Sequence, residues 1–116
     1  MSTKIEALKK ILELTLNGNR IPYLYRSYHL ASEKHCYCAL GCLLDENELD
    51  YLDRTGSMTL NIQSSNGTIQ RILMKLIKYG FTGTELYEIQ RKNDKLNDND
   101  FLKFISDKIN QEKSML

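Results

Sequence analysis

The chain of 116 residues has a length typical of one domain, large enough for a single hydrophobic core without disulfides or metals. Its composition, 41% hydrophobic and 27% charged residues, is that of a globular protein and argues against a disordered or fibrous chain. The 16 Lys and Arg residues nearly balance the 15 Asp and Glu residues. The basic excess typical of nucleic-acid-binding proteins is therefore missing, whereas little charge repulsion opposes a homo-oligomer.

The sequence favours a cytoplasmic protein without a membrane partner. No apolar run approaches the roughly 20 residues that a membrane-spanning helix needs. Residues 1–6 lead into a charged amphipathic segment that lacks the apolar core of a signal peptide. Cys36, Cys38 and Cys42 are odd in number and closely spaced, which makes a poor disulfide framework. We therefore expect reduced thiols.

The first part of the chain predicts a helix, a hairpin and a second helix. Apolar residues recur at helical spacing over 3–17, and Gly18 is the expected end of that helix. The aromatic, roughly alternating residues 23–30 favour a strand, and 35–37 would form the return strand. This return strand should lead directly into a helix over 38–46.

The second part of the chain predicts a further strand and three helices. Residues 45–54 are acidic and are predicted to be irregular, whereas 57–63 alternate and favour a strand. The strongest helical stripe lies in 69–77, where Ile and Leu recur at i, i+3, i+4, i+7 and i+8. Two more helices are expected, one over 84–91 and a last one beginning near 98–100.

Together these elements predict an α+β fold in a single domain, residues 1–116. Four or five helices would pack on a small antiparallel sheet or hairpin formed by residues near 23–37 and 57–63. We find no internal repeat in the sequence and no linker long enough to divide the chain.

The cysteine cluster raises the question of a metal site or a nucleophile. His29, Cys36, Cys38 and Cys42 are zinc-type ligands. Zinc modules use two separated ligand pairs, however, and this spacing differs, so packed core cysteines are the favoured interpretation. Cys38 near a helix start could have a lowered pKa, with His29 or His35 as its base, but no Cys-His-acid signature is present. We predict no catalytic residue, no bound metal and no cofactor.

Tyrosines and cationic residues alternate from Arg20 to Tyr37. Such side chains can stack on bases, hold a nucleotide or contact a protein. The alternative is a half-buried hairpin whose tyrosines pack inward and show their hydroxyl groups to solvent. Ligand- or partner-binding residues, if present, are predicted here: Tyr25, Arg26, Tyr28 and His29.

Opposite charges form two groups that are separate in the sequence. Arg71, Lys75 and Lys78 follow the polar face of the predicted helix 69–77, and the acidic group lies in 45–53. Complementary patches of this kind can mediate self-association. A solvated helix face and an acidic loop are the simpler interpretation.

The segment Tyr37-Cys38-Ala39-Leu40-Gly41-Cys42-Leu43 resembles the aromatic-Cys-(Cys/Ala)-Leu-Gly-(Val/Ala)-Leu motif of a family of small phage and prophage proteins. A second likeness is the C-terminal pair Asn93-Asp94, which precedes a helix containing Phe101 and Ile105. The order and spacing agree over most of the chain. The chain departs from the pattern at Cys42, where the family has an aliphatic residue, and in the longer loop 98–100.

This resemblance implies a non-enzymatic phage-type accessory protein that binds a host protein or a small ligand, and the phage setting suggests that it counteracts host defence. Asn93 and Asp94 become candidate binding residues, because a polar pair can either complete a helix end or line a pocket. Two alternatives remain: an oligomer that sequesters a nucleotide signal, and a small enzyme that uses Cys38 or a bound metal.

Overall fold

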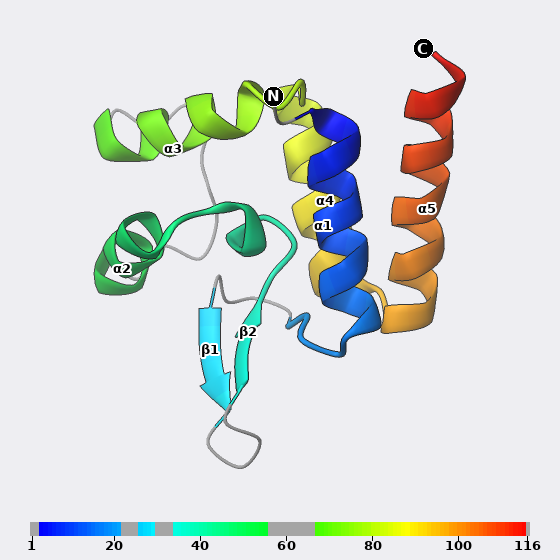
Figure 1. The fold of residues 1–116 in the computed structure, drawn as a ribbon. Helices are drawn as coiled ribbons and strands as arrows, with labels where there is room; N and C mark the ends of the chain where they lie inside the picture. The colour runs from blue at the N-terminus through cyan, green and yellow to red at the C-terminus, as the bar shows by residue number, and fades with distance from the viewer. Residues whose placement is uncertain (1–2, 22–25, 30–33, 56–66, 116) are drawn as a thin grey trace.

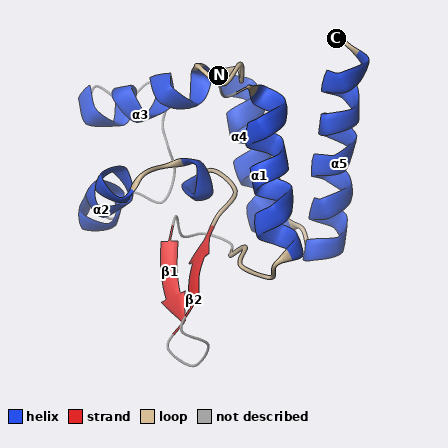
Figure 2. Ribbon diagram, in the orientation of Figure 1, coloured by secondary structure: helices blue, strands red, loops and turns tan. Residues whose placement is uncertain are grey.

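The computed structural model describes residues 3–21, 26–29, 34–55 and 67–115. This part of the chain forms five α-helices, one 3-10 turn and one hairpin (Figures 1 and 2). The helices are α1 (Lys4–Leu16), α2 (Glu46–Thr55), α3 (Gly67–Ile77), α4 (Gly83–Lys95) and α5 (Asp98–Ser114). The hairpin consists of β1 (Arg26–His29) and β2 (Lys34–Tyr37), and the 3-10 turn η1 is Gly41–Leu43.

The fold is mostly α-helical, so the predicted α+β fold with helices packed on a sheet is wrong. The two strands of four residues each pair antiparallel, from Arg26 opposite Tyr37 to His29 opposite Lys34. The helices pack on one another instead: α1 lies along α5 and contacts η1. Figure 1 shows the hairpin extending below the helices. Residues 57–63, the other predicted strand, lie outside the described residues.

Helix α1 confirms the helix predicted over 3–17. Thr3 Oγ1 accepts a hydrogen bond from Glu6 N at 3.2 Å, which satisfies one of the unpaired amides at the helix start. Gly18 follows the helix with φ 73°, a left-handed conformation that glycine adopts without a steric penalty. The buried face of α1 consists of Ala7, Leu8, Ile11 and Thr15.

The chain between β2 and α2 differs from the predicted helix over 38–46. It forms only the turn η1, and α2 begins at Glu46, inside the stretch predicted to be irregular. Asp45 N donates to Glu48 Oε1 at 2.8 Å, and Glu48 N donates to Asp45 Oδ1 at 2.9 Å. The acidic residues therefore cap the helix start in a reciprocal pair. Leu49 and Leu52, both 1% exposed, anchor α2 in the core.

The three C-terminal helices confirm the periodic patterns. Helix α3 buries Ile72, Leu73 and Leu76. Helix α4 runs four residues beyond the predicted end at Arg91 and begins with a capping box formed by Thr82 and Glu85. Helix α5 begins at Asp98, because Asn97 Oδ1 accepts a hydrogen bond from Asp100 N at 2.8 Å.

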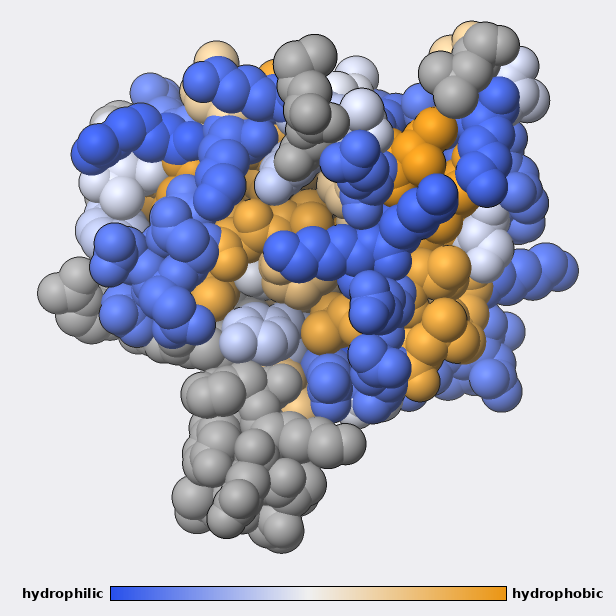
Figure 3. All heavy atoms as spheres, in the orientation of Figure 1, coloured by the Kyte–Doolittle hydropathy of each residue, from blue (hydrophilic) through white to orange (hydrophobic). Residues whose placement is uncertain are grey.

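The described residues share one hydrophobic core, to which all five helices and η1 contribute. At one end of it, Lys4 joins three helices: its Nζ pairs with Glu85 of α4 and lies 2.8 Å from Glu112 Oε1 of α5. Hydrophilic side chains cover much of the face shown in Figure 3, and apolar ones are visible between the helices. None of the described helices combines the length and the hydropathy of a membrane span.

Candidate functional site

The hairpin is fixed to the helices where its second strand ends. Tyr37 N donates to Asn19 O at 2.9 Å, and Ile21 N donates to Tyr37 O at 3.0 Å, so that the chain leaving α1 runs parallel to the end of β2. We call residues 19–21, residues 37–39 and Asn93 the hairpin base. These backbone bonds set the direction in which the hairpin leaves the helices.

Asn93 is the buried polar centre of the hairpin base. Its side chain projects from α4 and the residue is only 1% exposed. Asn93 Oδ1 accepts a hydrogen bond from Ala39 N at 3.0 Å, and Asn93 Nδ2 donates to Ile21 O at 3.0 Å. One amide thus satisfies a buried donor and an acceptor on two separate segments. It fastens both of these segments to α4.

Arg20 reaches from the hairpin base to the corner between α4 and α5. Its guanidinium donates to two backbone carbonyls at the end of α4, from Nη1 to Asn93 O and from Nη2 to Leu96 O at 2.9 Å. Nε and Nη2 both approach Asp98 Oδ1 of α5, at 3.0 and 2.8 Å. The guanidinium carbon lies 4.6 Å from the centre of the Phe101 ring.

These contacts place a cation at the end of α4, where the helix favours it, and beside the Asp98 carboxylate of α5. The last carbonyls of α4 carry partial negative charge and lack partners within the helix, so the guanidinium of Arg20 complements them. The planar fork of Arg also matches a carboxylate and an aromatic face better than a Lys ammonium does. The Arg20 side chain is 5% exposed, whereas the Asp98 side chain is 54% exposed. The ion pair is therefore reached by solvent from the Asp98 side.

The residues predicted as a binding site fall into two groups. Tyr25 lies outside the described residues, and of Arg26, Tyr28 and His29 the structure describes the backbone, as strand β1. Asn93 and Asp94 lie within α4. The side chain of Asn93 bonds the hairpin base, where it is buried. From the sequence, Arg20 was predicted only to be one of the cations between Arg20 and Tyr37, with no role of its own.

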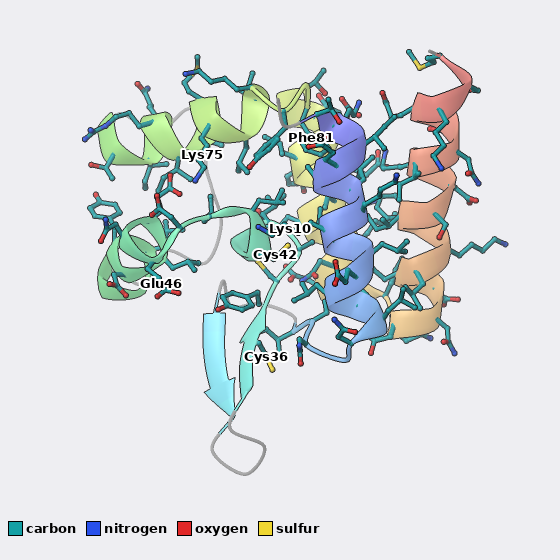
Figure 4. All side chains as sticks on the ribbon, in the orientation of Figure 1. Lys10, Cys36, Cys42, Glu46, Lys75 and Phe81 are labelled. Atoms are coloured by element: carbon teal, nitrogen blue, oxygen red, sulfur yellow. The ribbon has the colours of Figure 1, made fainter. Side chains whose placement is uncertain are left out.

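The fold sets Cys36 apart from Cys42, whereas Cys38 is a neighbour of Cys42. Figure 4 shows Cys36 on β2, apart from Cys42, which lies in η1 beside Lys10 of α1. Cys38 Sγ accepts a hydrogen bond from Gly41 N at 3.2 Å, and Cys42 Sγ donates to Ala39 O at 3.1 Å. In the described ranges, no three metal-ligating side chains of His, Cys, Asp or Glu form a group that could hold an ion.

Burial makes two of these thiols poor nucleophiles. It raises the pKa of Cys38 to about 11. Burial, together with the neighbouring Cys38, raises the pKa of Cys42 to about 12. Both groups are therefore protonated at neutral pH, although the thiolate is the reactive form. The hypothesis of a lowered pKa for Cys38 at a helix start is wrong, because η1 begins at Gly41 and the sulfur is buried.

The basic and acidic groups meet within the chain. Lys75 Nζ of α3 lies 2.7 Å from Glu48 Oε1 and 3.8 Å from Asp45 Oδ2, and Figure 4 shows Lys75 on the side of α3 that faces α2. Burial lowers the pKa of Lys75, but the hydrogen bond and attraction of Glu48 outweigh this and raise it. Lys75, Glu48 and Asp45 therefore pair with one another within one molecule.

The described part of the chain thus presents a short hairpin on a helical body, with its base fixed by Asn93 and Arg20. Such an arrangement can hold a recognition element in one orientation. Comparison of the chain with protein-family models, with curated proteins and with solved structures finds no match.

Proposed function

We propose that the protein acts by binding: as a phage-type accessory protein, it uses the β1–β2 hairpin to recognise a host protein or a small ligand and so counteracts host defence. The single observation that supports this proposal most is the anchored hairpin. An isolated two-stranded hairpin is marginally stable in water at best. The bonds of Asn93 and Tyr37 compensate for this where β2 ends.

Anchoring favours binding because it reduces the conformational entropy that the hairpin loses when a partner binds. A recognition element that is already held in its bound orientation loses less conformational freedom on association. The strand β1 itself carries Arg26, Tyr28 and His29. Tyr and Arg are enriched at protein interfaces and at their energetic centres, and the same residue types can stack on a nucleotide base.

The buried thiols support binding over cysteine catalysis. A nucleophilic cysteine needs access to its substrate and a thiolate at working pH. Cys38 is 3% exposed, and both Cys38 and Cys42 have a raised pKa. Sequestration of a nucleotide signal is kept as the small-ligand form of the proposal, because cations and aromatics share the hairpin.

A photocrosslinking experiment tests the partner. A photoreactive phenylalanine analogue replaces Tyr28 in β1 or, as a control, Tyr87, which is 68% exposed on α4. Both proteins are expressed in bacteria that carry a defence system and are irradiated during phage infection. We expect one host protein to be crosslinked from position 28 and not from position 87. Equal crosslinking from both positions would contradict recognition by the hairpin.

Phage growth provides the functional readout. The double variant Arg26→Ala/Tyr28→Ala should lose the ability to raise plaque numbers on the defended host, whereas Tyr87→Ala should keep it. Native mass spectrometry of the protein from the same cells reports a retained small ligand, whose mass should vanish in the double variant. A double variant that protects phage as well as the original protein would refute the proposed function.

A further inference from the structure

One side chain connects the hairpin to the last two helices. Arg20 belongs to the hairpin base through its backbone, which bridges to Tyr37 at the end of β2. Its guanidinium contacts α4 through Leu96 O and α5 through Asp98 Oδ1. The residues that it joins are 17 to 78 positions away from it in the sequence.

The contacts of this guanidinium leave little room for an alternative arrangement. It is nearly buried, it donates to carbonyls and a carboxylate, and its central carbon lies over the Phe101 ring. A buried charge with several hydrogen bonds is costly to displace, because the groups that it leaves behind lose their partner. A shift of the hairpin base would therefore disturb the start of α5, and a shift of α5 would disturb the hairpin base.

We propose that Arg20 is a positioning residue that couples the orientation of the β1–β2 hairpin to the corner between α4 and α5. Loosening the first turn of α5 releases the hairpin, and an occupied hairpin tightens that turn. Reciprocity of this kind is required of any thermodynamic coupling between two sites. Its use rests on the proposed function, whereas the coupling itself is a property of the free protein.

Hydrogen exchange of the free protein tests the coupling. Arg20→Lys keeps the positive charge but removes the fork that bonds two carbonyls and a carboxylate at once. We expect exchange to become about tenfold faster both in peptides that cover residues 36–39 and in those that cover 97–101, because charge-assisted hydrogen bonds are lost. Peptides covering the middle of α1, around Leu8 and Ile11, should keep their rate. Acceleration of one segment alone, or of neither, would overturn the proposal.

A second pair of variants covers the case that Arg20→Lys does not fold. Asp98→Asn removes the charge from the carboxylate that faces Arg20, and Asp100→Asn removes a charge from the same first turn of α5. Both variants remove an acid from the helix start, where acids are favourable. Only Asp98→Asn should accelerate exchange in residues 36–39, although Asp98 lies in a different element. Equal effects of the two variants at 36–39 would sink the coupling.

The experiments can refute the coupling through Arg20 and the proposed function independently of each other. Paired loosening in Arg20→Lys, with unchanged phage growth in the Arg26→Ala/Tyr28→Ala variant, would uphold the coupling and remove the proposed function. Loss of growth in the double variant without paired loosening in Arg20→Lys would do the reverse. Where a partner has been crosslinked, Arg20→Lys should also weaken its binding, although no hairpin side chain has changed.

Discussion

Asn93 Oδ1 accepts a hydrogen bond from Ala39 N across 54 positions of sequence. Ala39 lies in the cysteine-containing segment and Asn93 in the Asn-Asp pair, the two segments that the sequence singled out most strongly. The fold brings them into direct contact in the core, next to the end of β2. Their shared feature is structural: one supplies a buried amide donor and the other the acceptor that satisfies it.

Replacing Asn93 with Ala should destabilise the protein by about 2–4 kcal/mol, because Ala39 N and Ile21 O lose their partners in a buried place. Urea unfolding followed by circular dichroism measures the change. Asn110→Ala, on the exposed face of α5, is the matched control and should change the free energy of unfolding by less than about 0.5 kcal/mol. A loss in Asn93→Ala no larger than the control's would show that the amide is dispensable.

Replacing Lys4 with Met should cost about 1 kcal/mol at neutral pH, because the ion pairs with Glu85 and Glu112 disappear. Burial lowers the pKa of Lys4, but hydrogen bonds to Glu112 and Glu85 outweigh it and raise the pKa. For Glu85, burial raises the pKa, but the hydrogen bond and the charge of Lys4, together with the hydrogen bonds of Thr82, outweigh it and lower the pKa. Lys9→Met, at an exposed position of α1, is the control.

The raised pKa of Lys4 and the lowered pKa of Glu85 predict opposite dependences of the free energy of unfolding on pH. A raised lysine pKa stabilises the folded state below about pH 10.4, and this stability is lost as the pH rises further. A lowered glutamate pKa stabilises it above about pH 4.3, and this stability is lost as the pH falls further. Thermal unfolding between pH 3 and 11 should show both declines in the original protein and weaker ones in Lys4→Met. Parallel curves for the two proteins would contradict the assignment.

Native-state alkylation should distinguish the three cysteines. Cys38 and Cys42 are buried thiols with raised pKa values, so labelling by iodoacetamide at pH 7.5 should require opening of the protein. Cys36 is partly exposed on β2 and should be labelled first. Mass spectrometry of digested samples over time measures the order. Labelling of Cys38 as fast as Cys36 would revive the cysteine-enzyme alternative.

The contact between α3 and α2 should contain a measurable but modest electrostatic component. A double-mutant cycle with Lys75→Met and Glu48→Gln should give a coupling of about 0.5–1 kcal/mol that shrinks at high salt. Glu48→Gln keeps an oxygen for the amide of Asp45, so the helix cap is retained. The same cycle with Lys78→Met in place of Lys75→Met is the control and should give no coupling.

Local signals predicted four of the five helices in the described residues. Thr3 and Gly18 mark the ends of α1, and the apolar stripe of α3 is visible without any tertiary information. Helix α2 was missed because Asp45 and Glu48, which cap it, were interpreted as an acidic loop. The fold class was wrong for a different reason: alternation indicates that a strand exists, but it does not say whether helices pack on it.

The candidate site was only half visible in the sequence. A resemblance pointed to Asn93, yet its bond to Ile21 spans 72 positions and has no periodic signature. The role of Arg20 depends on the corner between Leu96 and Asp98, which exists only once α4 and α5 have packed. A lone arginine after a helix gives no pattern from which such a contact can be inferred.

The contacts of Arg20 with Leu96 and Asp98 also determine when the hairpin base can be fixed to the helices during synthesis. The strands of the hairpin leave the ribosome well before Asn93, Leu96 and Asp98 do. Because a domain generally folds as a unit, the nascent hairpin lacks its contacts to α4 and α5 until both helices have emerged. A ribosome stalled before residue 93 would therefore carry a chain in which residues 19–21 can bond Tyr37, whereas the bonds of Asn93 and Arg20 that tie the hairpin base to α4 and α5 cannot yet form.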